Sequence, residues 1–461
     1  MPRHGEPGSG KGRSSVRGLI ELVVCTAISA SLLKAFLVEG FLISTGSMAP
    51  HLLGFHKQIR CPDCGFAFAR GTAVDGPSEQ PRVATCTNCG RQGIDVAAVP
   101  RNEGDQLLVH KLPWLFQPVA RWEPMVFRQP DHATTAFVKR VVGLPGESIR
   151  IRDGNIYANG KLCRKTLAEQ EALAIPVYID RHRSTKRASR WTTESGWTDR
   201  QPGFDFASVE HVTRWLSYRH HDIEEAGRVR DRYAYNPREP RSRTETVGEI
   251  LVRATLLSSP SVGRMVIELD TGHHQVAWIR DPRSHKQWLT IAGRRIKTLP
   301  MAAHASPTRQ TFAFSTIDRT LRAAINGRLV FPPVALPQPG PPRLATESRT
   351  PVKPLLRIGA SAGDLEVRNL RIDRDVFYRA AARQHAADKD WKLGDTEYFM
   401  LGDNSPVSLD SRSWTHPAVP RRLIIGRPVL VHLPSTQWPL STASGTRHIR
   451  IPDVSRIRYI R

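Results

Sequence analysis

The sequence predicts a mainly β protein with one N-terminal helix, and three observations lead to that prediction. Short apolar–polar alternations separated by Gly, Pro, Asp and Asn recur from residue 104 onward, a pattern typical of antiparallel strands. One uncharged apolar stretch lies near the N-terminus, and four of the six cysteines form two Cys-x2-Cys pairs. Since 461 residues are too many for one ordinary core, we expect several domains.

The charge balance favours an anionic membrane surface as a partner. Lys and Arg number 67 and Asp and Glu 43, a difference of 67 − 43 = 24. The basic residues are scattered, without a Lys/Arg block or an interleaved aromatic platform. A positive surplus near lipid head groups therefore accounts for them better than binding to nucleic acid, which we do not expect.

The apolar N-terminal stretch predicts a membrane anchor at residues 18–43. Its uncharged part, Leu22–Leu33, is short for a spanning helix. Counted through its flanks it is long enough, with Glu21, Lys34 and Glu39 reaching toward the interfaces. A cleaved signal peptide and a buried soluble helix are the alternatives.

Residues 1–17 are rich in Gly, Ser and Arg and predict a disordered cytoplasmic tail. Basic residues dominate this end, where only Glu6 opposes Arg3, Lys11, Arg13 and Arg17. The positive-inside rule then places the N-terminus in the cytoplasm and everything after residue 43 on the outer face.

The Cys-x2-Cys pairs, in "CPDCG" and "CTNCG", predict a zinc ribbon inserted at residues 58–90. Its ligands would be Cys61, Cys64, Cys86 and Cys89. With all four positions filled, the zinc would be structural and not catalytic. Two disulfides are the alternative, because the predicted compartment is oxidising.

The strand-and-turn pattern before residue 165 returns near the C-terminus, and this predicts a β domain whose sequence is interrupted. It takes in residues 44–57, 91–165 and 391–461. "SIRIRDGNIYANGKL" reads as a hairpin turning at Asp153-Gly154-Asn155, and 165–174 as a short helix.

The middle of the chain predicts an antiparallel sandwich inserted at residues 205–380. Regular alternating strands run from 247 to 378, including "TLRAAINGRLVF" with its Asn-Gly hairpin signal. Most of 181–245 is polar and Arg-rich, and its pattern predicts no element.

Three short segments carry residues capable of catalysis, although each has an ordinary structural reading. "STGSMAP" presents Ser47, but a serine is a nucleophile only when a base takes its proton. "FVKRVVGLPGE" sets Lys139 in an apolar strand, facing the same way as Phe137 and Val141. There burial would lower its pKa and free a neutral amine as base, whereas an edge-strand lysine would only discourage aggregation.

The third segment, "GDNSPVSLDSR", holds polar residues that could simply tie a turn. They are Asp403, Asn404, Ser408, Asp410 and Arg412. Ser408 could equally orient an amine.

Taken together and in this order, the three segments resemble the bacterial type I signal peptidases, membrane-bound Ser–Lys proteases of the S26 family. The matching pieces are Thr45–Met48 directly after the anchor, Lys139–Gly146, and Gly402-Asp403-Asn404 with Ser408, Asp410, Ser411 and Arg412. The resemblance covers residues 18–57, 100–165 and 391–435, under half of the chain, and implies a coiled β-sheet catalytic domain.

The resemblance also implies roles. Ser47 would be the nucleophile and Lys139 its general base, with Ser408 hydrogen-bonded to the amine. The Ser47 N–H and the Thr45 hydroxyl would meet the oxyanion. Asp410 and Arg412 would form a structural ion pair near Asp403.

An apolar lining for small substrate side chains would come from Ile43, Met48, Leu52, Phe137 and Val138. One departure from the family's pattern is "RWEPMVF" before the lysine, where Gly-Asp is usual. The sandwich resembles the laminin-G/concanavalin-like jelly roll, a fold that often binds glycans or polypeptides; a spacer role is equally open.

The resemblance therefore implies an inner-membrane, single-pass serine endopeptidase that cleaves signal peptides from secretory preproteins after small residues, without a catalytic cofactor. A catalytically inactive extracytoplasmic binding protein displaying the sandwich is the alternative. A self-cleaving Ser–Lys protein of the phage-repressor type is disfavoured by the anchor.

Overall fold

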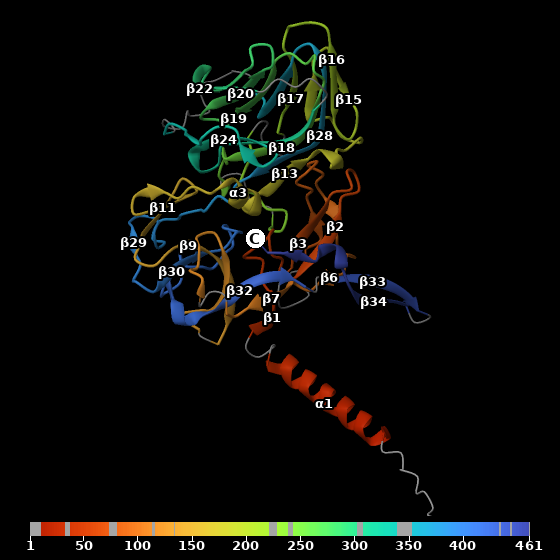
Figure 1. Cartoon of the computed structure of the whole chain (residues 1–461), viewed down its shortest axis with the longest axis vertical. Coiled ribbons are helices and arrows are strands. Elements are labelled where there is room, and N and C mark those ends of the chain that lie inside the picture. The colour runs from red at the N-terminus through yellow and green to blue at the C-terminus, as the bar shows by residue number, and fades with distance from the viewer. Residues whose placement is uncertain are drawn as a thin grey trace, which may run out of the picture.

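The computed structural model describes residues 11–32, 37–72, 81–112, 116–132, 134–220, 228–237, 243–301, 308–338, 353–432, 435–442 and 445–460. Strands dominate these ranges, so the predicted mainly β class is confirmed. Figure 1 shows the helix α1 standing apart, a β body joined to it through β1, and a second β body at the opposite end. We call the first body the core domain and the second the sandwich.

The N-terminal helix α1 (Lys11–Leu32) exposes its large apolar side chains, from Val16 to Ile28, to solvent. No helix in the described ranges combines the length and hydropathy that crossing a bilayer requires. The predicted anchor ended at residue 43, yet β1 (Val38–Leu42) is a strand that pairs with β7 (Gln106–His110). Phe41 packs on the core there, which is why the last residues of the apolar stretch join a sheet. Because α1 begins at Lys11, residues 11–17 of the predicted disordered tail are helical. Residues 1–10 and Lys34 lie outside the described residues.

The core domain is built on an eight-stranded sheet with the order β1-β7-β32-β8-β9-β30-β31, plus β35 paired with β32. Its strands come from residues before the sandwich and from residues after it. The bounds not yet given are β8 (Pro124–Arg128), β9 (Ala136–Gly143), β30 (Glu397–Leu401), β31 (Ala418–Pro420), β32 (Ile424–Val431) and β35 (Arg458–Tyr459). Because β9 lies between β8 and β30, side chains from residues far apart in sequence surround it.

A smaller sheet, β12-β11-β10-β29, completes the core domain. Its hairpin turns at Asp153 and Gly154, both at positive φ, and Asn155 already opens β11, so the turn is one residue shorter than predicted. The strands are β10 (Ser148–Arg152), β11 (Asn155–Ala158), β12 (Lys161–Leu162) and β29 (Trp391–Lys392). The predicted helix follows as α3 (Leu167–Leu173), which begins with a capping box between Thr166 and Glu169.

The cysteine-bearing insert is larger than its predicted range of 58–90. Strand β2 pairs with β3 and β6, and β4 pairs with β5. A small apolar core that includes Ile59, Phe68, Ile94 and Val96 draws the later residues in. The strands are β2 (His56–Arg60), β3 (Ala67–Gly71), β4 (Val83–Ala84), β5 (Ile94–Asp95) and β6 (Arg101–Asn102).

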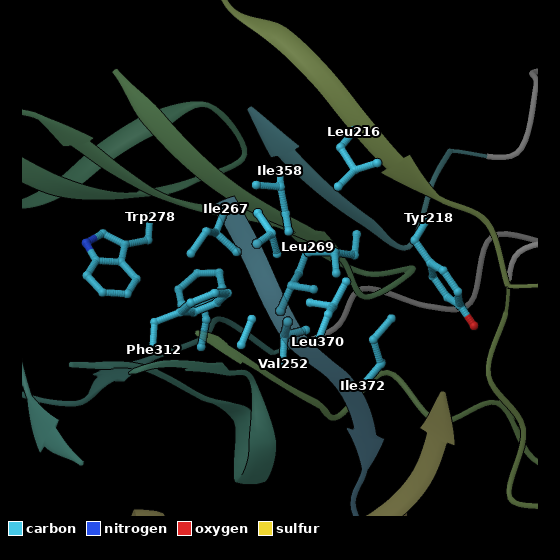
Figure 2. Packing of buried hydrophobic residues seen from close by; sticks show 14 of the residues in the cluster. Leu216, Tyr218, Val252, Ile267, Leu269, Trp278, Phe312, Ile358, Leu370 and Ile372 are labelled. Carbon is cyan, nitrogen blue, oxygen red and sulfur yellow. The ribbon is translucent and has the colours of Figure 1, made fainter. Parts of the chain in front are cut away.

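The sandwich consists of two antiparallel sheets over one apolar core, to which Figure 2 shows both sheets contributing. The first sheet has the order β15-β16-β28-β18-β23-β24-β25, with β13 on β28 and β26 on β24. The second has the order β14-β17-β27-β19-β20-β21-β22. The first-sheet strands are β13 (Ile175–Ile179), β15 (Trp197–Asp199), β16 (Phe204–Ser208), β18 (Ile250–Ser258), β23 (Thr308–Ser315), β24 (Thr320–Ile325), β25 (Arg328–Leu329), β26 (Val334–Ala335) and β28 (Gly363–Arg374). The second-sheet strands are β14 (Trp191–Thr193), β17 (Arg214–Tyr218), β19 (Met265–Asp270), β20 (Gln275–Asp281), β21 (Lys286–Ile291), β22 (Arg294–Pro300) and β27 (Leu356–Ala360).

The borders of the sandwich differ from the predicted 205–380. It begins at Ile175, because Tyr178, Trp191 and Trp197 are buried in its core. It ends at Arg374, after which Val376 and Tyr378 pack in the core domain. The Asn-Gly hairpin forms as predicted, with Asn326 and Gly327 at positive φ.

The remaining elements are short. They are β33 (Ser435–Thr442) paired with β34 (Gly445–Pro452), and the 3-10 turns η3 (Asp180–His182), η5 (Ile317–Arg319), η6 (Arg421–Leu423) and η7 (Val454–Arg456).

Candidate active site

The loop after β1 presents Ser47 in a tight turn. The Ala49 N–H donates to the Gly46 carbonyl at 3.0 Å, and Met48 is fully buried beneath the turn. Ser47 is half-buried and Thr45 is exposed, with their hydroxyl oxygens 3.5 Å apart. The buried methionine thus fixes the loop, while the two hydroxyls remain at its surface.

Lys139 lies at the centre of β9, where its side chain is buried to 1% exposure. Strand alternation places it on the face of Phe137, and its Nζ lies 5.6 Å from the centre of that ring. Burial, which disfavours the charged ammonium, lowers the pKa of Lys139 from 10.5 to about 8. A substantial fraction of the amine is therefore neutral in mildly alkaline solution.

Two buried carboxylates near Lys139 are already paired with arginines. Arg412 donates to both oxygens of Asp410, at 2.8 and 2.7 Å. Arg140 donates to both oxygens of Asp403, at 2.7 and 2.6 Å. Among the described residues no ion pair joins Lys139 to either carboxylate. Although burial opposes it, each guanidinium holds the pKa of its partner carboxyl below the usual value.

Ser408 lies beside Gly402, close to the Ser47 backbone. A Cβ on Gly402 would stand 2.2 Å from Ser408 Oγ and 2.5 Å from the Ser47 carbonyl oxygen, so only glycine fits there. The expected hydrogen bond between Ser408 and Lys139 is not formed, since Ser408 Oγ is buried and has no hydrogen-bond partner in the part of the chain that the structure describes. Among the described residues, no hydrogen bond joins Ser47 Oγ to Lys139 Nζ either. Within the described ranges the three side chains therefore form no hydrogen-bonded chain.

Of the predicted apolar lining, three members are core residues. Ile43, Met48 and Leu52 are 7% exposed or less and pack with Leu107 and Val126. Phe137 and Val138 are half-buried. The deep burial follows from their position, since the nucleophile loop is held to the sheet by these side chains. Only Phe137 and Val138 offer partly open apolar surface.

The structure adds site residues that the sequence analysis missed. His51 Nδ1 lies 2.8 Å from Asp403 Oδ2 and shares that carboxylate with Arg140. The adjacent positions of Lys139 and Arg140 in "FVKRVVG" could have indicated a second charged site, because alternation sends the two cations to opposite faces of β9. Two residues from the sandwich insert, Tyr233 and Asn236, also reach this site, and no local pattern marked them.

The four ribbon cysteines form one cluster. Cys61 and Cys89 have sulfurs 3.6 Å apart, and those of Cys64 and Cys86 are 3.7 Å apart. These separations equal the edge of a zinc–thiolate tetrahedron, about 3.8 Å for bonds of about 2.3 Å. All four cysteines are free thiols. The donor set therefore fits a structural zinc ion.

A second group of possible metal ligands already holds a lysine ammonium. Glu249, Asp318 and Asp375 lie close together at the border between the two bodies. Lys165 Nζ is 2.5 Å from Asp318 and 2.8 Å from Asp375. Burial, together with the two aspartates, raises the pKa of Glu249 to about 8. An ammonium fills this cluster as its internal cation.

Comparisons with known proteins agree with the motifs. The family model described as signal peptidase, peptidase S26 matches residues 98–200 and 358–433, which include Lys139 and the Gly402–Arg412 segment but not Ser47. Signal peptidase I V of Bacillus subtilis is 44% identical over 59 residues, covering 13% of this chain and 34% of that protein. Probable signal peptidase I-2 of Synechocystis is 35% identical over 79 residues, covering 16% and 34%. The matches thus span about a third of these relatives, and the predicted resemblance to type I signal peptidases is confirmed.

Two of the matching solved structures share only a distant likeness with the chain. The carbohydrate binding module CBM66 from Bacillus subtilis is 9% identical, with 40% of this chain and 96% of that chain covered and a TM-score of 0.26. The galectin LEC-6 of Caenorhabditis elegans is 16% identical over 27% of this chain and 81% of that chain, with a TM-score of 0.19. We draw neither a fold nor a ligand from scores this low.

Proposed function

Since the chain is similar to type I signal peptidases, we propose that it is a serine endopeptidase that removes signal peptides from secretory preproteins, cutting after small residues. The observation that carries the proposal is Lys139, a fully buried amine with a pKa near 8 inside the segment that the family model matches. Its neighbours Asp403 and Asp410 are each held by an arginine, so they do not trap it as an ammonium.

The proposed reaction is acyl transfer through Ser47. Neutral Lys139 takes the Ser47 hydroxyl proton as the oxygen attacks the scissile carbonyl. The oxyanion is met by the Ser47 N–H and the Thr45 hydroxyl, and the Lys139 ammonium returns its proton to the departing amine. Water, deprotonated by Lys139, then releases the acyl group. Ser408 contributes its hydroxyl beside this path, and Phe137 with Val138 contacts the small substrate side chains.

Preprotein cleavage by the full chain in detergent micelles tests the activity. The wild type should cut a model preprotein at one site, and Ser47→Ala should leave it uncut with unchanged thermal stability. An inactive wild type would support the alternative, a binding protein that displays the sandwich.

A comparison of two Thr45 variants tests the oxyanion role. Thr45→Ser keeps the hydroxyl and should be nearly silent. Thr45→Val removes it, and the loss of one such donor typically lowers turnover about 10²- to 10³-fold. Equal rate constants for the two variants on one preprotein would withdraw the assignment of Thr45.

The proposed location is the inner membrane, with α1 as a single-pass anchor, the N-terminus in the cytoplasm and both β bodies on the outer face. Support comes from the uncovered apolar residues of α1, among them Leu19 at 61% and Leu22 at 63% exposed. Partition of the full chain into membranes that resists alkaline carbonate checks it, and release of the chain would contradict it.

A structural zinc ion is proposed for the ribbon, held by Cys61, Cys64, Cys86 and Cys89. Metal analysis of purified protein should find one zinc per chain, and thiol titration after denaturation should find all six cysteines reduced. Two disulfides without metal would contradict this.

A glycan or polypeptide ligand of the sandwich stays a prediction from its resemblance to jelly-roll folds.

A further inference from the structure

A segment of the sandwich insert, residues 228–237, reaches from the sandwich core to the nucleophile loop. Its first part belongs to the sandwich, where Val229 is buried and accepts a hydrogen bond from the Val247 N–H at 2.8 Å. Two residues further on, Asp231 pairs with Arg379 of the core domain. Tyr233 is then buried in the hydrophobic core of the core domain. We call residues 228–237 the bridging segment.

The bridging segment contacts the Gly402-Asp403-Asn404 motif through two side chains. Tyr233 Oη donates to the Asp403 carbonyl at 2.8 Å. Asn236 and Asn404 form a reciprocal amide pair, each Nδ2 donating to the other Oδ1 at 2.7 Å. Both amides are buried, with Asn236 at 9% exposure and Asn404 fully covered.

Asn404 passes this contact on to the nucleophile. Its Nδ2 also donates to the Gly46 carbonyl at 2.9 Å, and its backbone N–H donates to the Ser47 carbonyl at 3.0 Å. The Gly46 carbonyl and the Ser47 N–H belong to one planar trans peptide, so they point in opposite directions. Whatever fixes the Gly46 carbonyl therefore aims the Ser47 N–H.

The amide pair restrains the Asn404 side chain, whose Nδ2 faces Gly46. A half-turn of the Asn404 amide alone would bring its oxygen against the Gly46 oxygen and break both bonds to Asn236, so the two amides could turn only together. The Tyr233 hydroxyl restrains a second peptide group that contacts the nucleophile loop. It holds the carbonyl of the Asp403–Asn404 peptide, whose N–H binds Ser47.

We propose that Asn236 is a positioning residue for the proposed peptidase, acting through Asn404 to aim the Ser47 N–H at the oxyanion, with Tyr233 in a lesser supporting role. The inference rests on the proposed function. It makes the sandwich insert part of the catalytic apparatus, because both residues lie in the 201–357 region that the family model does not match. Orientation of the oxyanion donor acts on the transition state and not on the bound substrate.

The test is the Asn236→Ala variant of the full chain in detergent micelles, assayed on a model preprotein. The kcat should fall about tenfold, the worth of one hydrogen bond, with KM unchanged. Affinity for a peptide aldehyde ending in alanine, which forms a tetrahedral oxyanion with a serine, should fall by the same factor. The pH midpoint should stay where it is, since the base is untouched.

Matched variants separate positioning from damage to the fold. Asn155→Ala removes a buried amide that donates at 3.1 Å to Asp153 and Glu249, away from the nucleophile loop, and should leave kcat unchanged. Tyr233→Phe deletes only a hydroxyl and should lower kcat two- to fivefold. Tyr378→Phe deletes a buried hydroxyl that has no hydrogen-bond partner among the described residues, and it should not lower kcat.

The outcomes are distinct. A kcat within twofold of wild type in Asn236→Ala, or a loss of kcat without weaker aldehyde binding, overturns the inference while the proposed function stands. A wild-type chain that cleaves no preprotein overturns the proposed function and the inference together.

Discussion

Two buried lysines, one in each part of the core domain, have opposite electrostatic surroundings. Lys139 on β9 and Lys165 before α3 are 1% and 2% exposed, and two aspartates lie near each. Burial lowers the pKa of Lys139 to about 8. For Lys165 burial acts in the same direction, but Asp318 and Asp375 raise the pKa above its ordinary value.

The difference comes from the arginines. Near Lys139 each aspartate already has a guanidinium, Arg412 on Asp410 and Arg140 on Asp403. At Lys165 the ammonium itself is the partner, 2.5 Å from Asp318. A buried lysine is therefore a usable base only where other cations neutralise the nearby carboxylates.

The largest expected effect is on catalysis at the first lysine. Lys139→Met should abolish preprotein cleavage, by about 10⁴-fold or more, and the double variant with Ser47→Ala should be no worse, because nucleophile and base act as a unit. Its thermal midpoint at pH 7 should not fall, since a poorly solvated charge is removed. A Lys139→Met variant that loses much less than this 10⁴-fold would show that Lys139 is not the general base.

The next effect is on stability at the second lysine. Lys165→Met leaves Asp318, Asp375 and Glu249 buried without a cation, which typically costs about 3–5 kcal/mol. The thermal midpoint should drop by about 10 °C at pH 8. The drop should shrink at pH 5, where protonation of Glu249 is favoured. Cleavage per folded molecule should match wild type, and a specific loss of kcat would contradict the structural role of Lys165.

A third change would make Lys139 resemble Lys165. Arg412→Met frees Asp410, and the unpaired carboxylate should raise the pKa of Lys139 by about one unit, so that activity at pH 7 falls about tenfold. Raising the pH to 10 should restore most of the rate. Arg253→Met is the control, since its partner Asp373 keeps Arg371. An unshifted pH midpoint in Arg412→Met would show that Asp410 does not act on the amine.

The smallest effect is the pH dependence of the wild type. Because the folded pKa of Lys139 is near 8, activity should rise several-fold between pH 7 and 8.5 through one ionisation. The contribution of Lys139 to the free energy of unfolding should also rise with pH. The unfolded lysine binds more protons between pH 8 and 10.5, so this residue's contribution to folding improves as pH rises through that window. A profile that falls over pH 7–8.5 would contradict a lysine base.

Local patterns were enough to predict part of this site. Strand alternation placed Lys139 beside Phe137, and the Asp153-Gly154 and Asn326-Gly327 turns form as their residues indicate. Long-range pairing was beyond such patterns. Arg140 takes its partner Asp403 from 263 positions away, and Asn236 lies in a polar segment without periodicity. The sandwich border was missed because Trp191 and Trp197 stand among arginines, and only their burial reveals them as core residues.

Strands β13 and β28, by which the chain enters and leaves the sandwich, have a consequence for the order of folding. Ile175 pairs with Arg374, so the folded sandwich brings its two chain ends side by side. Pairing of β9 with β30 must otherwise close a loop that contains the whole insert, and this closure entropy delays contacts between distant segments. With the sandwich formed first, the effective loop shrinks to a few dozen residues. Pairing of β9 with β30, in which Arg140 lies opposite Leu401, would then bring the segment that carries Asp403 and Asp410 to Lys139.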